Sequence, residues 1–408
     1  MQKLINLRQY NLILIRYNEI WLKSQKVKMR MLKILMDNIK NILNRERIAF
    51  HKYQLSSDST RIFFFFKNED IPNAVKVLKK VFGIYSLSPA LRTSSKLKNI
   101  KERIIKVCEN LLEKGDTFAL RVKRSGKHEF SSQDVAVYVG KAIIDHFSNL
   151  ELKVNLSNPK KKIFIEVRDE FAYIFTQIFK SKWGGLPIEP YKKILIMDIG
   201  RINDIIAGFL LMRRGCVIYP ILFNLTENNK VFEKWLSNWR EIGQFTPFFK
   251  FRIRIINLAK IIENILLNLD NKEYICAICR LIRWDIISKI LKNSKVKKFN
   301  KIRAISDGVS LNSSTLCSDN VDLESISLNY LFSEYPIFTP LIGLDKTMIQ
   351  KFQNRISRKL LDFDYCQYKP KNQEFNDNVL ESLYRSLNVE ELIKESIESM
   401  EEFDIMES

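Results

Sequence analysis

The chain has 408 residues, 46% of them hydrophobic and 28% charged, and its formal net charge is +21. This length exceeds one typical domain and indicates roughly two to four domains with packed cores. The positive charge favours an acidic partner, most simply a nucleic acid, with a membrane surface as the rival interpretation. An uninterrupted apolar run of about 18 residues is absent from the sequence, and the first residues lack a signal-peptide layout. We therefore expect a cytoplasmic protein with no membrane partner.

The first 88 residues are predicted to form a small α+β domain. Apolar runs indicate strands, and apolar residues at helical spacing indicate helices. The expected elements are a strand at 10–16, a helix at 26–44, a strand at 61–66 and a helix at 71–81. The pair Ser88-Pro89 marks the end of this domain.

Residues 89–182 are predicted to form a second α+β domain that is strongly basic. The expected elements are a basic linker running into a helix over 91–112, a strand at 117–123, a basic loop through 130, a helix from 131 and strands at 163–168 and 172–179. Ser131 and Asp134 have the spacing of a capping box at the start of their helix.

Seven cations of this second domain are candidates for contacts with nucleic-acid phosphates. They are Arg121, Lys123, Arg124, Lys127, Lys160, Lys161 and Lys162. Cations clustered in this way can neutralise several phosphates. Lysine predominates among them, which favours contact with the backbone over the reading of bases.

Residues 183–375 are predicted to form an α/β domain with a doubly wound parallel sheet. The stretch Trp183–Pro187 contains two glycines and a proline and separates this domain from the preceding one. After it, apolar strands alternate with helices, and the strands are expected at 194–197, 217–223 and 302–306. Residues 376–408 carry a net charge of −8 and are predicted to form an acidic helical tail, clearest at 389–400.

The stretch 193–215 reads as a buried strand, a turn at Gly200 and a helix. Backbone N–H groups of such a turn, together with the helix dipole, can bind phosphate. An ordinary strand-to-helix corner is the alternative, because a single glycine is a weak signal.

Six cysteines in a long cytosolic chain are better interpreted as thiols or metal ligands than as disulfides. Cys276 and Cys279 have a spacing that suits a shared metal or a redox pair. They could equally be two small buried hydrophobic residues. Cys366 is a candidate third ligand or a nucleophile.

Six stretches, in this order, resemble the tRNA 4-thiouridine synthetases (the ThiI family) over nearly the whole chain. They are RYNEIWLKSQ (16–25), RVKRSGKHEFSSQDVAVYVG (121–140), NPKKKIFIEVRDEFAYIF (158–175), GGLP (184–187), CAICR (276–280) and PIFTPLIGLDK (336–346). The resemblance implies a ferredoxin-like domain, a THUMP RNA-binding domain and a PP-loop ATP-pyrophosphatase domain. Members of the family use ATP and Mg to adenylate a uridine oxygen of tRNA, which sulfur then replaces.

The resemblance also implies partners and site residues. The basic residues would hold tRNA. Cys276, Cys279 and Cys366 match three cysteines that hold a 4Fe–4S cluster in the archaeal branch, whereas in other members the residue matching Cys366 is catalytic. The chain ends without the rhodanese domain of longer relatives, so an external sulfur donor is expected, and a homodimer is compatible with the family.

The nucleotide site departs from the family pattern. The nucleotide-contacting positions are Met197, Asp198, Gly200, Leu222, Phe223 and Arg280. The family's phosphate loop, SGGxDS, falls on residues 199–204, where Gly200 is retained and Arg201 replaces the second glycine. In a second family stretch Ser313 and Thr315 match, but Ser314 stands in place of a glutamine.

Two hypotheses follow. The first is a divergent tRNA sulfurtransferase, in which Arg201 clamps phosphate. The second is a THUMP-type tRNA-binding protein or partner subunit whose α/β domain no longer hydrolyses ATP. The kept cysteines favour the first hypothesis, and the eroded phosphate loop favours the second.

Overall fold

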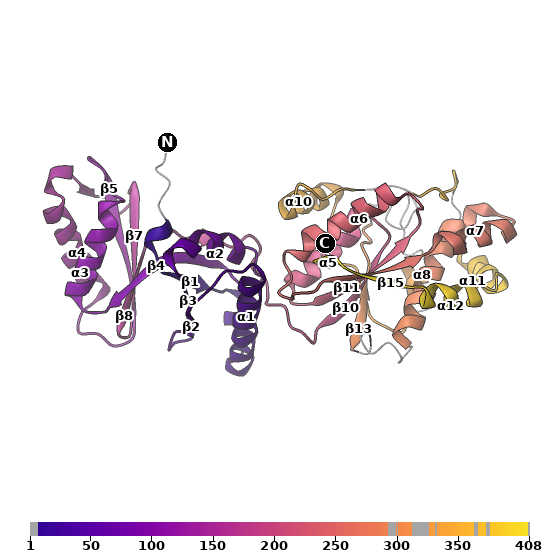
Figure 1. Cartoon of the computed structure of the whole chain (residues 1–408), viewed down its shortest axis with the longest axis horizontal. Helices are drawn as coiled ribbons and strands as arrows, with labels where there is room; N and C mark the ends of the chain where they lie inside the picture. Colours follow the sequence, from indigo (N-terminus) through magenta and orange to yellow (C-terminus); the bar gives the residue numbers. More distant parts are fainter. Residues whose placement is uncertain are drawn as a thin grey trace. The chain divides into compact units, whose positions relative to one another are not determined.

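The computed structural model divides the chain into two compact units, Met1–Leu186 and Pro187–Ser408 (Figure 1). The residues that it describes are 7–292, 299, 301–311, 326–330, 333–362, 366–372 and 376–406. The boundary between the units falls within the predicted break at 183–187. The predictions for Ser313, Ser314 and Thr315 lie outside the described residues.

From residue 7 onward, where the structure describes it, the first unit contains one long sheet and four α-helices. Its strands are β1 (Leu12–Arg16), β2 (Lys52–Leu55), β3 (Ile62–Phe65), β4 (Ser86–Ser94), β5 (Thr117–Ser125), β6 (Lys153–Val154), β7 (Lys161–Arg168), β8 (Phe171–Phe175) and β9 (Phe179–Lys180). Its α-helices are α1 (Gln25–Arg45), α2 (Ile71–Leu78), α3 (Leu97–Glu109) and α4 (Ser132–His146). The strand order is β2-β3-β1-β4-β8-β7-β5-β6, and β9 pairs with β4.

β4 joins two half-sheets of the first unit. Its first half pairs with β1, where Leu87 lies opposite Ile15, and its second half pairs with β8, where Leu91 lies opposite Ile174. The apolar stripes of α1 and α2 pack on the first half. α3 and α4 lie side by side and cover one face of the second half (Figure 1). This α+β arrangement agrees with the predicted fold class.

Two local predictions for this unit are wrong. Residues 91–94 belong to β4 rather than to a basic linker, because the sheet accommodates Pro89 within the strand. β5 continues to Ser125 and pairs along its length with β7, so the residues expected on a basic loop begin on a strand. The capping box is confirmed, since Ser131 and Asp134 exchange hydrogen bonds between side chain and backbone.

The second unit is built around a six-stranded sheet. Its strands are β10 (Lys193–Asp198), β11 (Val217–Asn224), β12 (Arg252–Asn257), β13 (Ile302–Ser306), β14 (Ile337–Phe338) and β15 (Glu401–Asp404). The α-helices among the described residues of this unit are α5 (Ile202–Arg213), α6 (Asn229–Gly243), α7 (Ala259–Asn268), α8 (Ile275–Lys292), α10 (Lys346–Ile356), α11 (Asp377–Ser386) and α12 (Glu390–Glu398).

Helices cover both faces of this sheet. The strand order is β14-β13-β10-β11-β12-β15, and each pairing is parallel except that of β12 with β15. On one face α5 and α6 pack together, with Gly208 against Trp239 and near Ile218. On the other face Leu195 and Ile221 join the apolar cluster of α7 and α8. This is the predicted doubly wound architecture.

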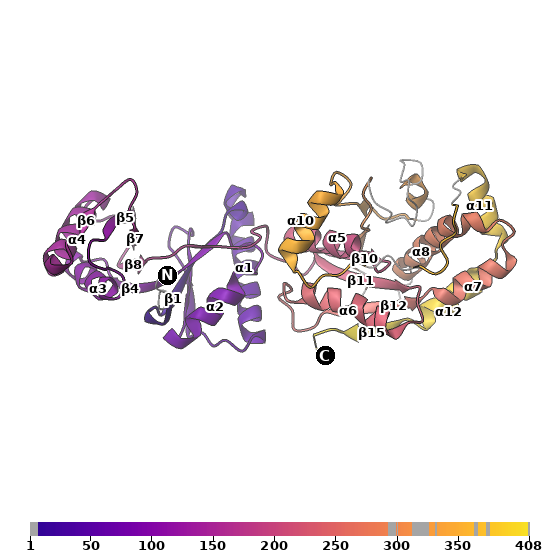
Figure 2. The same cartoon turned by 90° about the horizontal axis from the view of Figure 1, so that it is seen from above.

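The acidic tail forms two helices, α11 and α12, which pack against the second unit by their apolar sides and leave most acidic side chains exposed. Leu380 of α11 and Ile393 of α12 are fully buried in the cluster around α8. Figure 2 shows α11 and α12 beside α7 and α8. β15 then adds an antiparallel edge strand, with Glu402 opposite Arg254. In the described part of the chain no helix is both long and apolar enough to cross a bilayer.

Candidate functional site

The second half-sheet of the first unit carries charged and aromatic side chains on the face opposite α3 and α4. Residues that lie opposite each other in paired strands share a face. Arg121 of β5 lies opposite Phe164 of β7, which in turn lies opposite Phe175 of β8. The two phenylalanine rings stack with centroids 5.1 Å apart and an interplanar angle of 5°. The guanidinium of Arg16 lies 5.0 Å from the centroid of the Phe175 ring.

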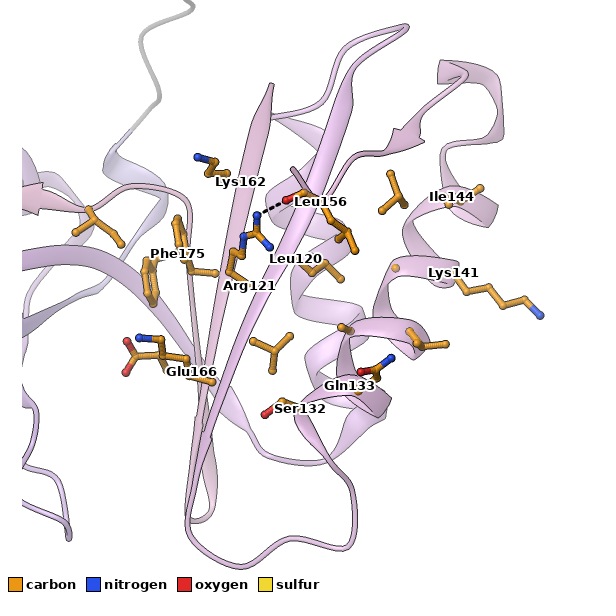
Figure 3. A pocket seen from close by; sticks show the side chains of 18 of the residues that line it. Leu120, Arg121, Ser132, Gln133, Lys141, Ile144, Leu156, Lys162, Glu166 and Phe175 are labelled. Atoms are coloured by element: carbon orange, nitrogen blue, oxygen red, sulfur yellow. Dashed lines mark hydrogen bonds between the residues drawn. The ribbon is translucent and has the colours of Figure 1, made fainter. Parts of the chain in front are cut away.

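A groove of about 1020 Å³ begins on this face and extends around β5 to α4 (Figure 3). Val137, Ile144 and Leu156 line its α4 side, and these apolar side chains are 64%, 39% and 62% exposed. Five cations also line the groove: Arg16, Arg121, Lys123, Lys141 and Lys162. Cationic edges around apolar and aromatic surface are what single-stranded nucleic acid requires, because phosphates and base faces are bound together.

The structure brings three of the seven predicted phosphate-binding residues into this groove, namely Arg121, Lys123 and Lys162. Arg124 and Lys127 are exposed outside its lining, close to the end of β5. Lys160 and Lys161 are ion-paired with the buried Asp116, at 2.6 and 3.9 Å. Sequence reasoning missed Arg16 and Lys141, because only the folded sheet brings β1 and α4 to the groove.

A buried ion cluster lies at the floor of the groove. The Glu166 carboxylate accepts hydrogen bonds from Arg16 Nη2 and Arg61 Nε at 2.9 Å each, and from Arg168 Nε at 3.2 Å. Burial alone would raise the pKa of Glu166, but the three guanidinium groups lower it to about 2. The cluster ties β1 and the start of β3 to β7, and so joins the two half-sheets beneath the groove.

The second unit has the strand, turn and helix in which a nucleotide-phosphate loop is expected. β10 ends at Asp198, Gly200 adopts a φ of +84°, and α5 begins at Ile202. We call the space between this turn, the amino end of α5 and the turn after β13 (307–309) the crevice. In open parallel sheets ligands bind outside the carboxyl ends of the strands, which is where the crevice lies.

Side chains of the chain itself occupy the phosphate position. A Cβ atom built on Gly200 would lie 2.5 Å from Cε2 of Trp235, so this indole covers the turn directly. The backbone N–H of Ile202, in the first turn of α5, donates to the carboxylate of Asp362 at 3.3 Å. This amide is one of those that would meet a phosphate in a loop of this kind. It already has an anionic partner.

The turn after β13 closes the crevice from the other side. The Gly308 backbone N–H donates to Asp204 Oδ1 at 2.8 Å, and the Asn203 amide donates to the Gly308 carbonyl at 3.2 Å. A Cβ atom on Gly308 would lie 2.5 Å from the backbone of Asn203 and Asp204. The cavity that remains, lined in part by Arg280, has a volume of about 10 Å³. Among the residues that the structure describes, this cavity is far smaller than the 300–1,000 Å³ typical of small-molecule sites.

Three buried carboxyl groups form the polar centre of the closed crevice. Asp198 accepts from Trp239 Nε1 at 2.6 Å and from the Gly200 N–H at 2.7 Å. Burial and repulsion by Asp204 raise the pKa of Asp198, and burial raises the pKa of Asp204. Burial also raises the pKa of Asp307 to about 7. Removal from water thus makes each of these carboxyl groups harder to ionise than in solvent.

The predicted nucleotide-contacting residues are all in the core. Met197 and Arg280 line the small cavity, and Arg280 Nε donates to Asn329 Oδ1 at 2.7 Å. Leu222 and Phe223 are fully buried in β11. The four-residue spacing of Trp235 and Trp239 places them on one face of α6, but only the tertiary packing brings that face to the crevice.

The cysteines predicted to bind metal lie in or against one apolar cluster. Cys276 and Cys279 are on α8 and are only 5% and 7% exposed, and the half-buried Cys366 packs against the same cluster. Within the described ranges, no group of three or more His, Cys, Asp or Glu side chains is arranged to hold a metal ion. An iron–sulfur cluster held by these three cysteines therefore stays a prediction.

Comparisons with known proteins match the chain in three consecutive blocks. The ThiI ferredoxin-like domain matches residues 12–88, the THUMP domain matches 94–177, and the thiamine biosynthesis protein (ThiI) family matches 192–378.

Two relatives cover almost the full chain. The probable tRNA sulfurtransferase of Methanocaldococcus jannaschii is 31% identical over 382 residues, which are 88% of this chain and 92% of the relative. That of Methanobrevibacter smithii is 27% identical over 407 residues, which are 96% and 100% of the two chains. A crystal structure of a 4-thiouridine synthetase–RNA complex with bound ATP shares the fold, with a TM-score of 0.79 and 22% identity over 97% of this chain and 99% of that one.

Proposed function

Because the chain belongs to the ThiI family of tRNA sulfurtransferases, we propose that it binds tRNA and serves the biosynthesis of 4-thiouridine in tRNA. The groove on the first unit is the observation that carries this proposal. It combines five cations with apolar and aromatic surface in a volume of about 1020 Å³. This combination suits an unpaired RNA segment, whose phosphates meet the cations while its bases contact the apolar wall.

The groove favours an RNA partner over a membrane surface. A membrane-binding face would place an extended apolar surface beside cations, whereas here both line one groove that extends around β5 to α4. Lys123 and Lys162 are exposed at this space and lie on paired strands. They are therefore the residues most directly placed to meet phosphate.

Binding of ATP, which the family implies, does not fit the second unit. Trp235 covers the turn at Gly200, and the Asp362 carboxylate accepts the hydrogen bond of a backbone N–H in the first turn of α5. The cavity that remains has a volume of about 10 Å³. We derive no adenylation step for this chain. This observation favours a second candidate function, in which the protein is a tRNA-binding partner subunit that does not activate uridine itself.

The sulfur chemistry remains part of the proposal. The family resemblance assigns a metal-binding or catalytic role to Cys366, and an external sulfur donor would supply the sulfur atom. A homodimer and a cytoplasmic location remain predictions. The half-buried position of Cys366 leaves its thiol partly accessible, in contrast with the buried Cys276 and Cys279.

Binding of tRNA can be measured by fluorescence anisotropy between about 50 and 200 mM salt. We expect wild-type protein to bind with a steep salt dependence, and the double variant Lys123→Gln/Lys162→Gln to bind about tenfold more weakly with a shallower slope. The matched control is Lys98→Gln/Lys106→Gln, which removes the same charge from exposed positions on α3. Equal affinities for the two double variants would contradict binding in the groove.

The second candidate function is tested by release of AMP and pyrophosphate from ATP in the presence of tRNA and sulfide. A closed crevice predicts no release above the background of protein-free samples. Release that depends on both the protein and tRNA would restore the sulfurtransferase alternative.

A further inference from the structure

A separate pocket of about 440 Å³ lies at the amino ends of the parallel strands in the second unit. The first residues of β10, β11 and β12 line it, together with the segment 246–251 that precedes β12. The crevice lies at the carboxyl ends of the same strands, so this pocket is at the opposite edge of the sheet. Its volume is within the range of small-molecule sites.

The pocket is strongly cationic. Four cations line it, namely Lys193, Lys250, Arg252 and Arg254. Among the residues that the structure describes, no aspartate or glutamate is part of the lining. Three carboxylates lie behind the lining. Glu402 on β15 bridges Arg252 Nη1 at 2.8 Å and Arg254 Nη2 at 2.7 Å, Asp404 accepts from the Phe251 N–H at 3.2 Å, and Glu189 is ion-paired with Lys192. The lining itself is cationic, and this favours an anion.

Arg254 supplies a donor that the protein leaves unused. Its residue is only 2% exposed, and within the described parts of the chain Nη1 has no hydrogen-bond partner. A buried donor without a partner costs free energy, which an acceptor placed in the pocket would recover. A ligand oxygen is such an acceptor, and a guanidinium favours carboxylate, sulfonate or phosphate oxygens.

An aromatic ring, that of Tyr219, lies close to two of the cations. The Tyr219 ring centroid is 5.3 Å from Lys193 Nζ and 5.7 Å from Arg254 Cζ. Phe248 and Val217 add apolar surface to the lining. A ligand that uses the whole pocket therefore carries a planar apolar body beside its acidic group.

We propose that this pocket binds a small organic anion, whose acidic group contacts Arg254 and Lys193 and whose planar apolar body packs on Tyr219. The site is independent of the tRNA groove and of the crevice, because none of its lining residues belongs to either.

Titration of the full chain with 8-anilino-1-naphthalenesulfonate, followed by its fluorescence, tests the proposal. This probe is an aromatic anion, and N-phenyl-1-naphthylamine is its uncharged analogue. We expect saturable binding of the anionic probe, at least tenfold weaker binding of the analogue, and at least tenfold weaker binding of the anion to Arg254→Gln and Lys193→Gln.

Two controls keep the result specific. Lys193 is at the half-buried rim of the pocket, so Lys193→Gln remains informative if Arg254→Gln fails to fold. The variant Lys123→Gln/Lys162→Gln removes two cations from the groove of the first unit and should leave this binding unchanged. Wild-type affinity in Lys193→Gln, equal affinity for the two probes, or displacement of the anionic probe by tRNA would each overturn the proposal.

Discussion

At the scale of single residues, Glu166 is the clearest case of a side chain whose environment decides its chemistry. It is 3% exposed and is surrounded by Arg16, Arg61 and Arg168, which hold it ionised despite its burial. Disrupting this buried ion cluster should cost much free energy of folding, because removal of the carboxylate leaves three largely buried guanidinium groups without a counter-charge.

We expect Glu166→Gln to lower the free energy of unfolding by about 3 kcal/mol, measured by urea denaturation. The exposed Glu170, at the turn after β7, offers the matched control, and Glu170→Gln should change stability by less than about 0.5 kcal/mol. Similar losses in the two variants would show that the ion cluster does not join the half-sheets.

The pH dependence gives a second test of the cluster. The folded pKa of Glu166 lies below its ordinary value of 4.5, so the ionised form is favoured in the folded state. Its contribution is present above about pH 4.5 and is lost as the pH falls towards about 2. Wild-type protein should therefore lose more stability across this interval than Glu166→Gln, and parallel curves for the two proteins would contradict the assignment.

The pKa of Asp307 in the crevice is shifted in the opposite direction to that of Glu166. Its folded pKa is raised to about 7, so the protonated form is favoured on folding and its contribution is full below about pH 4. That contribution declines as the pH rises towards 7. We expect Asp307→Asn to flatten the decline in urea denaturation between pH 4 and 8, whereas the exposed Asp270→Asn should leave it unchanged. An unaltered decline in Asp307→Asn would place its origin elsewhere.

At the scale of secondary-structure elements, the sequence carries much of the local information. The stripe of α1, the capping box at Ser131 and the strand–turn–helix at Gly200 were all predictable from spacing and residue type, because short-range geometry determines them. The closure of the crevice was not predictable in the same way. It depends on Trp235 and Asp362, which reach Gly200 and Ile202 only through tertiary packing.

The groove shows the same limit. Lys123 and Lys162 were identified from a basic run, since clustered cations are visible in the sequence. Lys160 belongs to the same run but pairs with Asp116, which no local pattern reveals. Arg16 lines the groove from β1, which lies more than 100 positions before β5 in the sequence. Only the strand order of the complete sheet brings these two strands to the same groove.

The contact between Gly200 and Trp235 makes the closure of the crevice measurable. We expect Gly200→Ala to lower stability by about 2–4 kcal/mol, because the new methyl group meets the indole and the φ of +84° disfavours alanine. Gly115 has a φ of +74° with nothing within 4 Å of its added Cβ, so Gly115→Ala should cost only about 1 kcal/mol.

A double-mutant cycle isolates the contact itself. In a Trp235→Ala background, the cost of Gly200→Ala should fall to that of Gly115→Ala, since only backbone strain remains. If the cost of Gly200→Ala is the same with and without Trp235, the indole does not cover the turn in solution.

At the scale of the whole molecule, the two units differ in whether their candidate binding site is open. The first unit has a cationic groove with apolar walls, which suits RNA. The second unit has the doubly wound sheet of the family, but its own side chains fill the crevice at the carboxyl ends of the strands. We therefore propose that the chain binds tRNA through the groove, and that the closed crevice leaves no place for ATP among the described residues.

Isothermal titration calorimetry of the full chain with tRNA and, separately, with ATP and Mg tests this claim most directly. We expect saturable heat with tRNA at low salt that weakens steeply as salt is added, and no saturable heat with millimolar ATP. Saturable binding of ATP at micromolar concentration, or the absence of heat with tRNA, would contradict the account.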